Sequence, residues 1–281
     1  MKLATVAVDG RTTWGVVEGE TFRDVGAVLG ARYADLKAAI AGGLAGVAEA
    51  TSSAASVSVS KVTWLPVIPN PDKILCVGLN YETHRKETGR DEVEHPTIFA
   101  RYANSQTGHL QPIVRPRVST QLDFEGELAV IIGKAGRYIS RADAISHVVG
   151  YACYNDGSVR DFQRHTHQFT PGKNFPDTGA FGPWMMTPDQ LGPLGELKLQ
   201  TRLNGEVMQE AFIKQMIFDI PRQIEYCSTF TRLEPGDVIV SGTPGGVGSR
   251  RQPPLWMKAG DVVEIEVERL GVLRNPVTDE A

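Results

Sequence analysis

Three acidic residues begin or follow apolar segments of the chain. Glu125 and Glu127 lie two residues apart beside the apolar run 128–132, and the two-residue period of a strand points both side chains to one face. Asp156 follows the apolar run 148–154. Like charges held away from water need a cation, a proton or an arginine between them. Oxygen ligands favour Mg²⁺ or Mn²⁺, with Ca²⁺ possible, over zinc. The alternatives are a solvated strand end for the glutamates and a turn for Asp156.

His84 and Glu87 lie three residues apart in the segment CVGLNYETHRKE (76–87). On a helix this spacing places both side chains on one face, within reach of each other. A carboxylate that orients an imidazole makes a general-base pair able to activate water. An exposed helix with an incidental pair is the alternative.

Two further segments are weaker candidates. SGTPGGVG (241–248) lacks the GK[ST] ending of a phosphate-binding loop, so it is interpreted as a loop whose N–H groups and Thr243 hydroxyl bind a substrate carboxylate. A plain tight turn explains it nearly as well. His165 and His167 could ligate zinc only with a third ligand, and none stands at a recognised spacing.

The elements that must position these residues are short and rich in strand formers. Strands are predicted at 74–77, 97–100, 127–132, 148–154, 197–203, 238–240 and 262–267, and helices at 140–144 and 219–230. Because strands and helices do not alternate, the pattern excludes a Rossmann fold or a TIM barrel. It favours a β-rich α+β fold.

The first 70 residues have a different pattern. A hairpin is predicted from strands 3–8 and 13–17 around Asp9-Gly10, followed by a helix over 32–49. The Ser/Ala tract 51–60 and prolines up to Pro71 then resemble a connection. The sequence therefore predicts a small N-terminal α/β domain at 1–70 and a catalytic domain at 71–281.

Composition excludes several classes of protein. The 281 residues carry 29 basic and 33 acidic side chains, a net charge of -4, with no basic run, so nucleic acid is not an expected partner. No apolar run approaches the roughly 18 residues of a membrane span, and no secretory signal is recognisable. Three widely spaced cysteines fit neither a disulfide framework nor a zinc site. A soluble cytoplasmic protein is expected.

Taken together, these segments resemble the fumarylacetoacetate hydrolase family. The matching phrases, in the family's order over about residues 70–277, are GLNYETHRKE (78–87), PTIFAR (96–101), LDFEGELAVIIGK (122–134), YNDGSVRDFQ (154–163), PGKNFPDTGAFGPW (171–184), LNGEVMQE (203–210) and SGTPGGVG (241–248). The resemblance implies a mixed β-sandwich roll with a small N-terminal domain, and a homodimer. It also implies a divalent cation on Glu125, Glu127 and Asp156.

The resemblance assigns roles to the other candidate residues. His84 and Glu87 would lie on a lid as the water-activating pair, and Lys173 would hold the departing enolate. The substrate-binding residues would be Arg160, Gln163 and Thr243. Tyr102, Phe162, Phe169 and Trp184 are candidates for contacting the acyl group.

The expected function is metal-dependent hydrolysis of a C–C bond in 2,4-dioxo acids of the acylpyruvate or fumarylpyruvate type, through an enolate. Isomerisation of 2-hydroxyhepta-2,4-diene-1,7-dioate or 5-carboxymethyl-2-hydroxymuconate, and decarboxylation of oxaloacetate, are alternatives on the same site. The N-terminal segment resembles that of family members that act in aromatic catabolism, so the isomerase is the leading alternative. A non-catalytic metabolite-binding protein is the alternative from another class.

Overall fold

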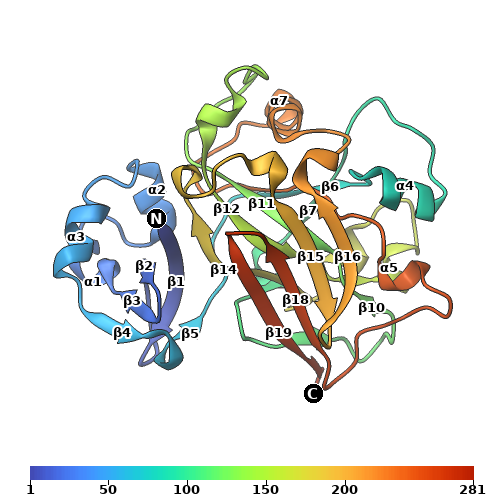
Figure 1. Ribbon diagram of the computed structural model, residues 1–281, viewed down its shortest axis with the longest axis horizontal. Helices are drawn as coiled ribbons and strands as arrows, with labels where there is room; N and C mark the ends of the chain where they lie inside the picture. The colour runs from blue at the N-terminus through green and yellow to red at the C-terminus, as the bar shows by residue number, and fades with distance from the viewer.

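The computed structural model describes all residues, 1–281, and its N-terminal part forms a lobe beside the main body (Figure 1). The lobe contains strands β1 (Lys2–Val8), β2 (Arg11–Glu18), β3 (Thr21–Arg23), β4 (Ser56–Ser58) and β5 (Thr63–Trp64), and helices α1 (Val25–Leu29), α2 (Leu36–Ala41) and α3 (Val47–Ser53). The predicted hairpin is confirmed. Asp9 and Gly10 both have positive φ, 49° and 80°, as the tight turn between β1 and β2 requires.

The single helix predicted over 32–49 is wrong. Helix α2 ends at Ala41 with Gly42 as its C-cap, and Gly43 and Leu44 have positive φ values of 67° and 57° before α3 begins. A helix cannot continue through left-handed residues, so the Gly-Gly pair divides the segment into two short helices.

The main body consists of strands packed as two large sheets, with a separate two-stranded sheet of β10 and β13. Its strands are β6 (Ile74–Gly78), β7 (Thr97–Arg101), β8 (Gln106–Thr107), β9 (Ile113–Arg115), β10 (Leu122–Asp123), β11 (Gly126–Ile132), β12 (Val148–Asn155), β13 (Ser158–Val159), β14 (Gly179–Met186), β15 (Lys198–Leu203), β16 (Glu206–Phe212), β17 (Val238–Val240), β18 (Val262–Val267) and β19 (Gly271–Asp279). The larger sheet has the order β4-β3-β2-β1-β14-β12-β11-β17-β6-β7, and the smaller one β16-β15-β18-β19-β9. This is the β-rich α+β architecture that the sequence predicts.

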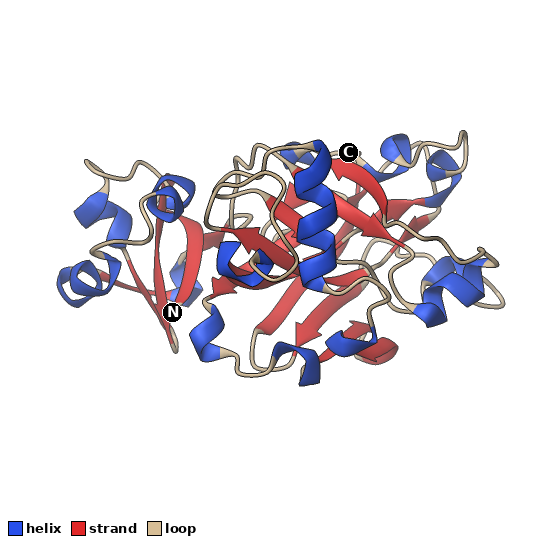
Figure 2. Cartoon of the chain, turned by 90° about the horizontal axis from the view of Figure 1, so that it is seen from above, coloured by secondary structure: helices blue, strands red, loops and turns tan.

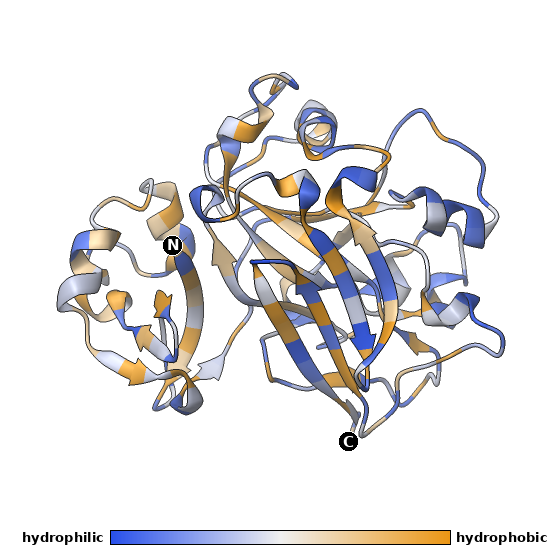
Figure 3. Ribbon diagram, in the orientation of Figure 1, coloured by the Kyte–Doolittle hydropathy of each residue, from blue (hydrophilic) through white to orange (hydrophobic).

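The two sheets differ in how they meet water. Every residue of β11 is buried, because the sheet is covered on both faces. Strands β15 and β18 alternate between buried and partly exposed residues, and Figure 3 shows the same alternation of apolar and polar side chains along them. The smaller sheet therefore covers one face of the larger and turns its own polar face outward.

Short helices surround the strands, as Figure 2 shows. The body contains α4 (Glu82–Thr88), α5 (Arg160–Gln163), α6 (Thr170–Lys173) and α7 (Ile220–Phe230). The prediction of α7 is confirmed, and its N-cap is Asp219, whose carboxylate accepts from the Arg222 N–H. The helix predicted at 140–144 is wrong: turns precede a short 3-10 helix at Ala144–His147. None of the helices combines the length and apolar character that crossing a membrane requires.

The lobe and the body share a sheet and a core. Strand β1 pairs antiparallel with β14 through Lys2 opposite Met186 and Leu3 opposite Met185. One apolar cluster contains Trp14 and Leu36 of the lobe together with Ile131 of the body. The division into domains at residue 70 stays a prediction, and the structure adds that the two parts are packed through a common core.

His109 lies at the junction of the two parts. Its ring packs edge-on against Trp64 at 5.4 Å, and its Nδ1 accepts from the Arg274 N–H at 3.1 Å. Burial, and then the charge of Arg274, lower the pKa of His109 to about 4. The folded state therefore resists protonation of this ring.

A pH dependence of stability follows from this shift. Below the ordinary pKa of about 6.5 the unfolded chain binds the proton more readily, so stability falls from there to about pH 4. The free energy of unfolding should fall less in His109→Asn than in the wild type as the pH drops through this window. The expected difference is roughly 2 kcal/mol, which allows for the partial exposure of the ring. Urea unfolding at several pH values measures it. Equal pH slopes would contradict it.

Candidate metal centre and active site

Glu125, Glu127 and Asp156 lie close together in space. Strands β11 and β12 are antiparallel neighbours with Gly126 opposite Asn155, so the residues beside this pair meet at one end of the sheet. The Asp156 N–H also donates to the Glu125 carbonyl at 2.9 Å. Each of the three residues offers a carboxylate oxygen within 4.8 Å of the others, and all three are buried.

Two of these carboxylates have cationic partners. Glu125 accepts from Arg160 at 2.6 Å and from Lys173 Nζ at 2.7 Å. Asp156 accepts from Lys173 at 2.5 Å and from Arg101 at 2.5 Å. Although burial alone would raise the pKa of Glu125, Arg160 and Lys173 hold it below its usual range. Lys173 keeps a raised pKa despite its burial, because Asp156 and Glu125 surround its ammonium group.

Glu127 has no cationic partner. One of its oxygens accepts from the Gly242 N–H at 2.5 Å, and no side chain contributes a hydrogen bond. Burial, together with Asp156 and Glu125, raises the pKa of Glu127 well above its usual value. A divalent cation beside the three carboxylates would supply the missing positive charge, so these residues fit a hard metal ion.

His84 and Glu87 form the pair that their spacing predicts. Both lie on α4, with His84 Nδ1 2.7 Å from Glu87 Oε1, and His84 is buried. The other Glu87 oxygen accepts from the Gly246 N–H at 2.8 Å, which ties α4 to the glycine-rich loop. Because Nδ1 faces the carboxylate, Nε2 is the ring nitrogen left to meet a substrate.

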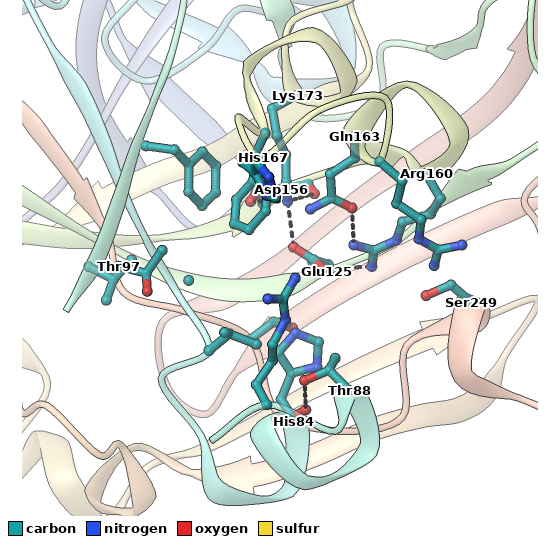
Figure 4. A pocket seen from close by; sticks show the side chains of 18 of the residues that line it. His84, Thr88, Thr97, Glu125, Asp156, Arg160, Gln163, His167, Lys173 and Ser249 are labelled. Atoms are coloured by element: carbon teal, nitrogen blue, oxygen red, sulfur yellow. Dashed lines mark hydrogen bonds and ion pairs between the residues drawn. The ribbon is translucent and has the colours of Figure 1, made fainter. Parts of the chain in front are cut away.

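One cavity of about 860 Å³ contains the imidazole and the three carboxylates (Figure 4). Helices α4 and α5 lie at the same end of the body (Figure 1), and this end carries the cavity. Of the predicted site residues it is lined by His84, Glu125, Glu127, Asp156, Arg160, Gln163, Lys173 and Thr243. Glu87 stands behind His84 and does not line it. Phe169 is the one acyl-group candidate in the wall; Tyr102, Phe162 and Trp184 are not.

The two histidines that the sequence analysis set aside as zinc ligands, His165 and His167, line the same cavity, and both are exposed. The His165 ring packs at 4.6 Å from Phe162. The group of acidic residues above is the potential metal cluster of this chain, and it includes no histidine.

Thr243 is already hydrogen-bonded on both sides. Its hydroxyl donates to the Gly126 carbonyl at 3.0 Å and accepts from Gln209 Nε2 at 2.8 Å. The Gln209 amide also accepts from the Gly126 N–H at 3.0 Å and donates to the Pro244 carbonyl at 2.8 Å. Gln209 therefore clamps the start of β11 to the glycine-rich loop.

Removal of this clamp has a predictable effect. Gln209→Ala leaves the buried Gly126 N–H and the Pro244 carbonyl without partners, so we expect a loss of about 2–4 kcal/mol in the free energy of unfolding. Gln200→Ala, on the outer face of β15, is the matched control and is expected to change it by less than about 0.5 kcal/mol. Denaturant unfolding of both variants tests this. Equal losses would contradict the bracing role of Gln209.

Sequence reasoning missed three buried residues of the site. Arg101 ends β7 and binds Asp156, and Asp123 accepts from Arg160 Nε at 2.8 Å. The third is Gln209. The two-residue spacing of Glu125 and Glu127 could have identified Asp123, because Asp123 precedes Glu125 by two positions. Arg101 and Gln209 had no such signal, since their partners lie far away in the sequence.

Comparison with known proteins bears on these findings. A family profile described as "Fumarylacetoacetate (FAA) hydrolase C-terminal" matches residues 73–278. The chain belongs to the fumarylacetoacetate hydrolase family. The fold agrees with that of solved structures in this family.

Three relatives indicate the range of the fumarylacetoacetate hydrolase family. The bovine "Oxaloacetate tautomerase FAHD2A, mitochondrial" is 42% identical over 220 residues, 78% of this chain and 70% of its own. A maleylpyruvate hydrolase of Sphingobium sp. SYK-6, solved with manganese(II) and pyruvate, has a TM-score of 0.83 at 28% identity over 100% of both chains. A 5-carboxymethyl-2-hydroxymuconate delta-isomerase of Mycobacterium smegmatis has a TM-score of 0.81 at 28% identity, again over 100% of both chains.

These comparisons support a metal-dependent enzyme that processes 2-oxo acids. The buried carboxylates could bind a divalent metal, and a fumarylacetoacetate hydrolase family structure of similar fold contains manganese. Members of the family include a tautomerase, an isomerase and a hydrolase.

Proposed function

We propose that this protein catalyses proton transfer at the enolate of a 2-oxo acid, with enol–keto tautomerisation of an oxaloacetate-like acid as its reaction. The observation that carries the proposal is the shared cavity, whose wall contains the His84 imidazole together with the carboxylates of Glu125, Glu127 and Asp156. The relative at 42% identity is named for this reaction.

The residues divide into two groups by their chemistry. A divalent cation held by Glu125, Glu127 and Asp156 would supply Lewis-acid stabilisation of the negative charge on a 2-oxo enolate. Lys173 and Arg160 fix the Glu125 carboxylate from two sides and add positive charge next to the place where the enolate oxygen develops. Gln163 accepts from Arg160 at 2.9 Å and keeps its NH₂ group for a substrate oxygen.

His84 is the group that moves the proton. In the tautomerisation it removes the enol O–H proton and, as the imidazolium so formed, gives a proton to the carbon next to the hydroxyl-bearing one, so the product is the keto acid and the imidazole is restored. Glu87 holds the ring in place through Nδ1. Thr243 lies in the cavity wall, where its hydroxyl is shared with Gly126 and Gln209, and its role toward a substrate carboxylate stays a prediction.

A second candidate is hydrolysis of a C–C bond in an acylpyruvate. The supporting observation is the His84–Glu87 pair, which can take a proton from water as well as from an enol. Hydroxide would add to the distal carbonyl, the C–C bond would break, and protonation of the departing enolate would give a 2-oxo acid and a carboxylic acid. The similar structure that contains manganese and pyruvate is a hydrolase.

The experiment compares substrates that separate these reactions. Loss of the enol absorbance of oxaloacetate, and loss of the absorbance of acetylpyruvate and fumarylpyruvate, are followed with Mg²⁺, with Mn²⁺ and with EDTA. We expect a metal-dependent increase in the oxaloacetate rate above the uncatalysed rate. Metal-dependent cleavage of the acylpyruvates alone would favour the hydrolase. Absence of any metal-dependent rate on the panel would contradict both candidates.

The panel also includes a 2-hydroxymuconate-type diene, and pyruvate is measured to detect decarboxylation of oxaloacetate, because both reactions need the same enolate. The homodimer, the closing lid and the cytoplasmic location stay predictions. Sedimentation of the full chain tests the first of these.

A further inference from the structure

Three guanidinium groups in the cavity wall have no carboxylate partner. They belong to Arg90, Arg164 and Arg250, and none of them takes part in an ion pair of the structure. Arg160, in the same wall, is bound to Asp123 and Glu125. The cavity therefore has cationic groups beyond those that compensate the buried carboxylates.

Arg164 and Arg250 stand on the same side of the cavity as Arg160. Arg164 directly follows α5, and Arg250 ends a 3-10 helix, Gly248–Arg250, whose first N–H groups bind Asp123. Burial, and then the positive charges of Arg160 and Arg250, lower the pKa of Arg164, against the opposing charges of Asp123 and Asp161. Arg164 and Arg250 therefore both present positive charge to this cavity.

The nearest carboxylates on this side are engaged elsewhere. Both oxygens of Asp123 accept hydrogen bonds, from Arg160 and from the Gly248 and Ser249 N–H groups. Asp161 accepts from the Ser119 hydroxyl at 2.7 Å and from the Phe162 N–H. These two carboxylates offset part of the positive charge on this side, but neither forms an ion pair with Arg164 or Arg250. Arg90, by contrast, has Asp91 next to it in the wall.

We propose that Arg164 and Arg250 bind a second carboxylate of the substrate, which makes them specificity-determining residues that favour 2-oxo dicarboxylic acids over monocarboxylic ones. The proposal rests on the proposed function, because the 2-oxo end of the substrate must lie at the three carboxylates. Paired guanidinium groups bind a carboxylate through charge-assisted, bidentate hydrogen bonds. Ser249, labelled in Figure 4, lines the same cavity and directly precedes Arg250.

The test uses two ligands that differ only in the second carboxylate. Binding of 2-oxoglutarate and of 2-oxopentanoate, both with five carbons and the same 2-oxo acid group, is measured by calorimetry with the Mn²⁺-loaded full chain. We expect the wild type to bind 2-oxoglutarate about 10- to 100-fold more tightly. In the double variant Arg164→Met with Arg250→Met this preference should fall to within about threefold, with 2-oxopentanoate binding unchanged.

Arg137→Met is the matched control, because it removes one exposed arginine outside the cavity and should keep the full preference. A wild type without preference, or a double variant that keeps it, would overturn the assignment of Arg164 and Arg250 while leaving the proposed function intact. Failure of the Mn²⁺-loaded wild type to bind either acid would overturn the proposed function and this inference with it. Circular dichroism of each variant separates a loss of binding from a loss of folding.

Discussion

Glu127→Gln is expected to lower the affinity for Mn²⁺ by more than about 100-fold, because it removes the charge of one of the three carboxylates proposed to hold the metal and leaves the fold in place. Glu127 is the best ligand to replace. Its carboxylate has no cationic partner, whereas loss of Asp156 would leave Arg101 and Lys173 buried without their counter-charge. Calorimetric titration of the metal-free protein with Mn²⁺ measures the effect, and Glu206→Gln, on the exposed part of β16, is the control.

In the metal-free protein, the same substitution should reduce the loss of stability that rising pH causes. The folded state raises the pKa of Glu127, so it binds a proton more readily than the unfolded chain above about pH 4.5, and stability falls as the pH rises through that window. Glutamine cannot ionise, so Glu127→Gln should show less of this fall. Saturating Mn²⁺ should stabilise the wild type by about 3 kcal/mol at 100 times its dissociation constant, and the variant much less. Unaltered Mn²⁺ affinity in the variant would show that the metal binds elsewhere.

His84→Asn should reduce kcat by about 10²- to 10⁴-fold on whichever substrate the wild type converts, because a proton-transfer group contributes that much to the rate. Its Mn²⁺ affinity should stay within about twofold of the wild type, since the imidazole is not one of the carboxylate ligands. Glu87→Gln should give a smaller loss, because it weakens the orientation of the ring without removing it.

His109→Asn is the control for this experiment, because it changes a histidine outside the cavity and should keep kcat. Steady-state rates and Mn²⁺ titrations on the same preparations separate catalysis from metal binding. Wild-type turnover by His84→Asn would move the proton-transfer role to another residue of the cavity, and a parallel loss of Mn²⁺ affinity would place His84 among the metal ligands.

The sequence contains local information about the site but little about long-range pairing. The two-residue period of Glu125 and Glu127 and the helical spacing of His84 and Glu87 depend on neighbours in the chain, and the structure has both. That Asp156 meets the glutamates depends on the register of β11 and β12, which spacing does not specify. Resemblance to a family supplied that link, whereas Arg164 and Arg250 emerged only when the loops were placed in space.

Strand β14, which the sequence analysis did not predict, shows that local residue preferences can also mislead. Its sequence, GAFGPWMM, contains Gly182 and Pro183, which normally argue against a central strand. The strand nevertheless lies between β1 and β12, because its apolar residues Phe181 and Met185 are buried in the core. Tertiary packing here overrides the local preference of the residues.

The shared sheet between lobe and body also bears on how the chain is made. The lobe is synthesised first, yet part of its core is supplied by Ile131 of β11 and Met185 of β14, far later in the chain. Completion of the lobe must therefore wait until most of the protein has left the ribosome, and contacts of such long sequence separation form slowly. A fragment cut near residue 70 would uncover the apolar edge where β1 meets β14. Each fragment would then be prone to aggregation, so we expect the lobe and the body to fold as one cooperative unit.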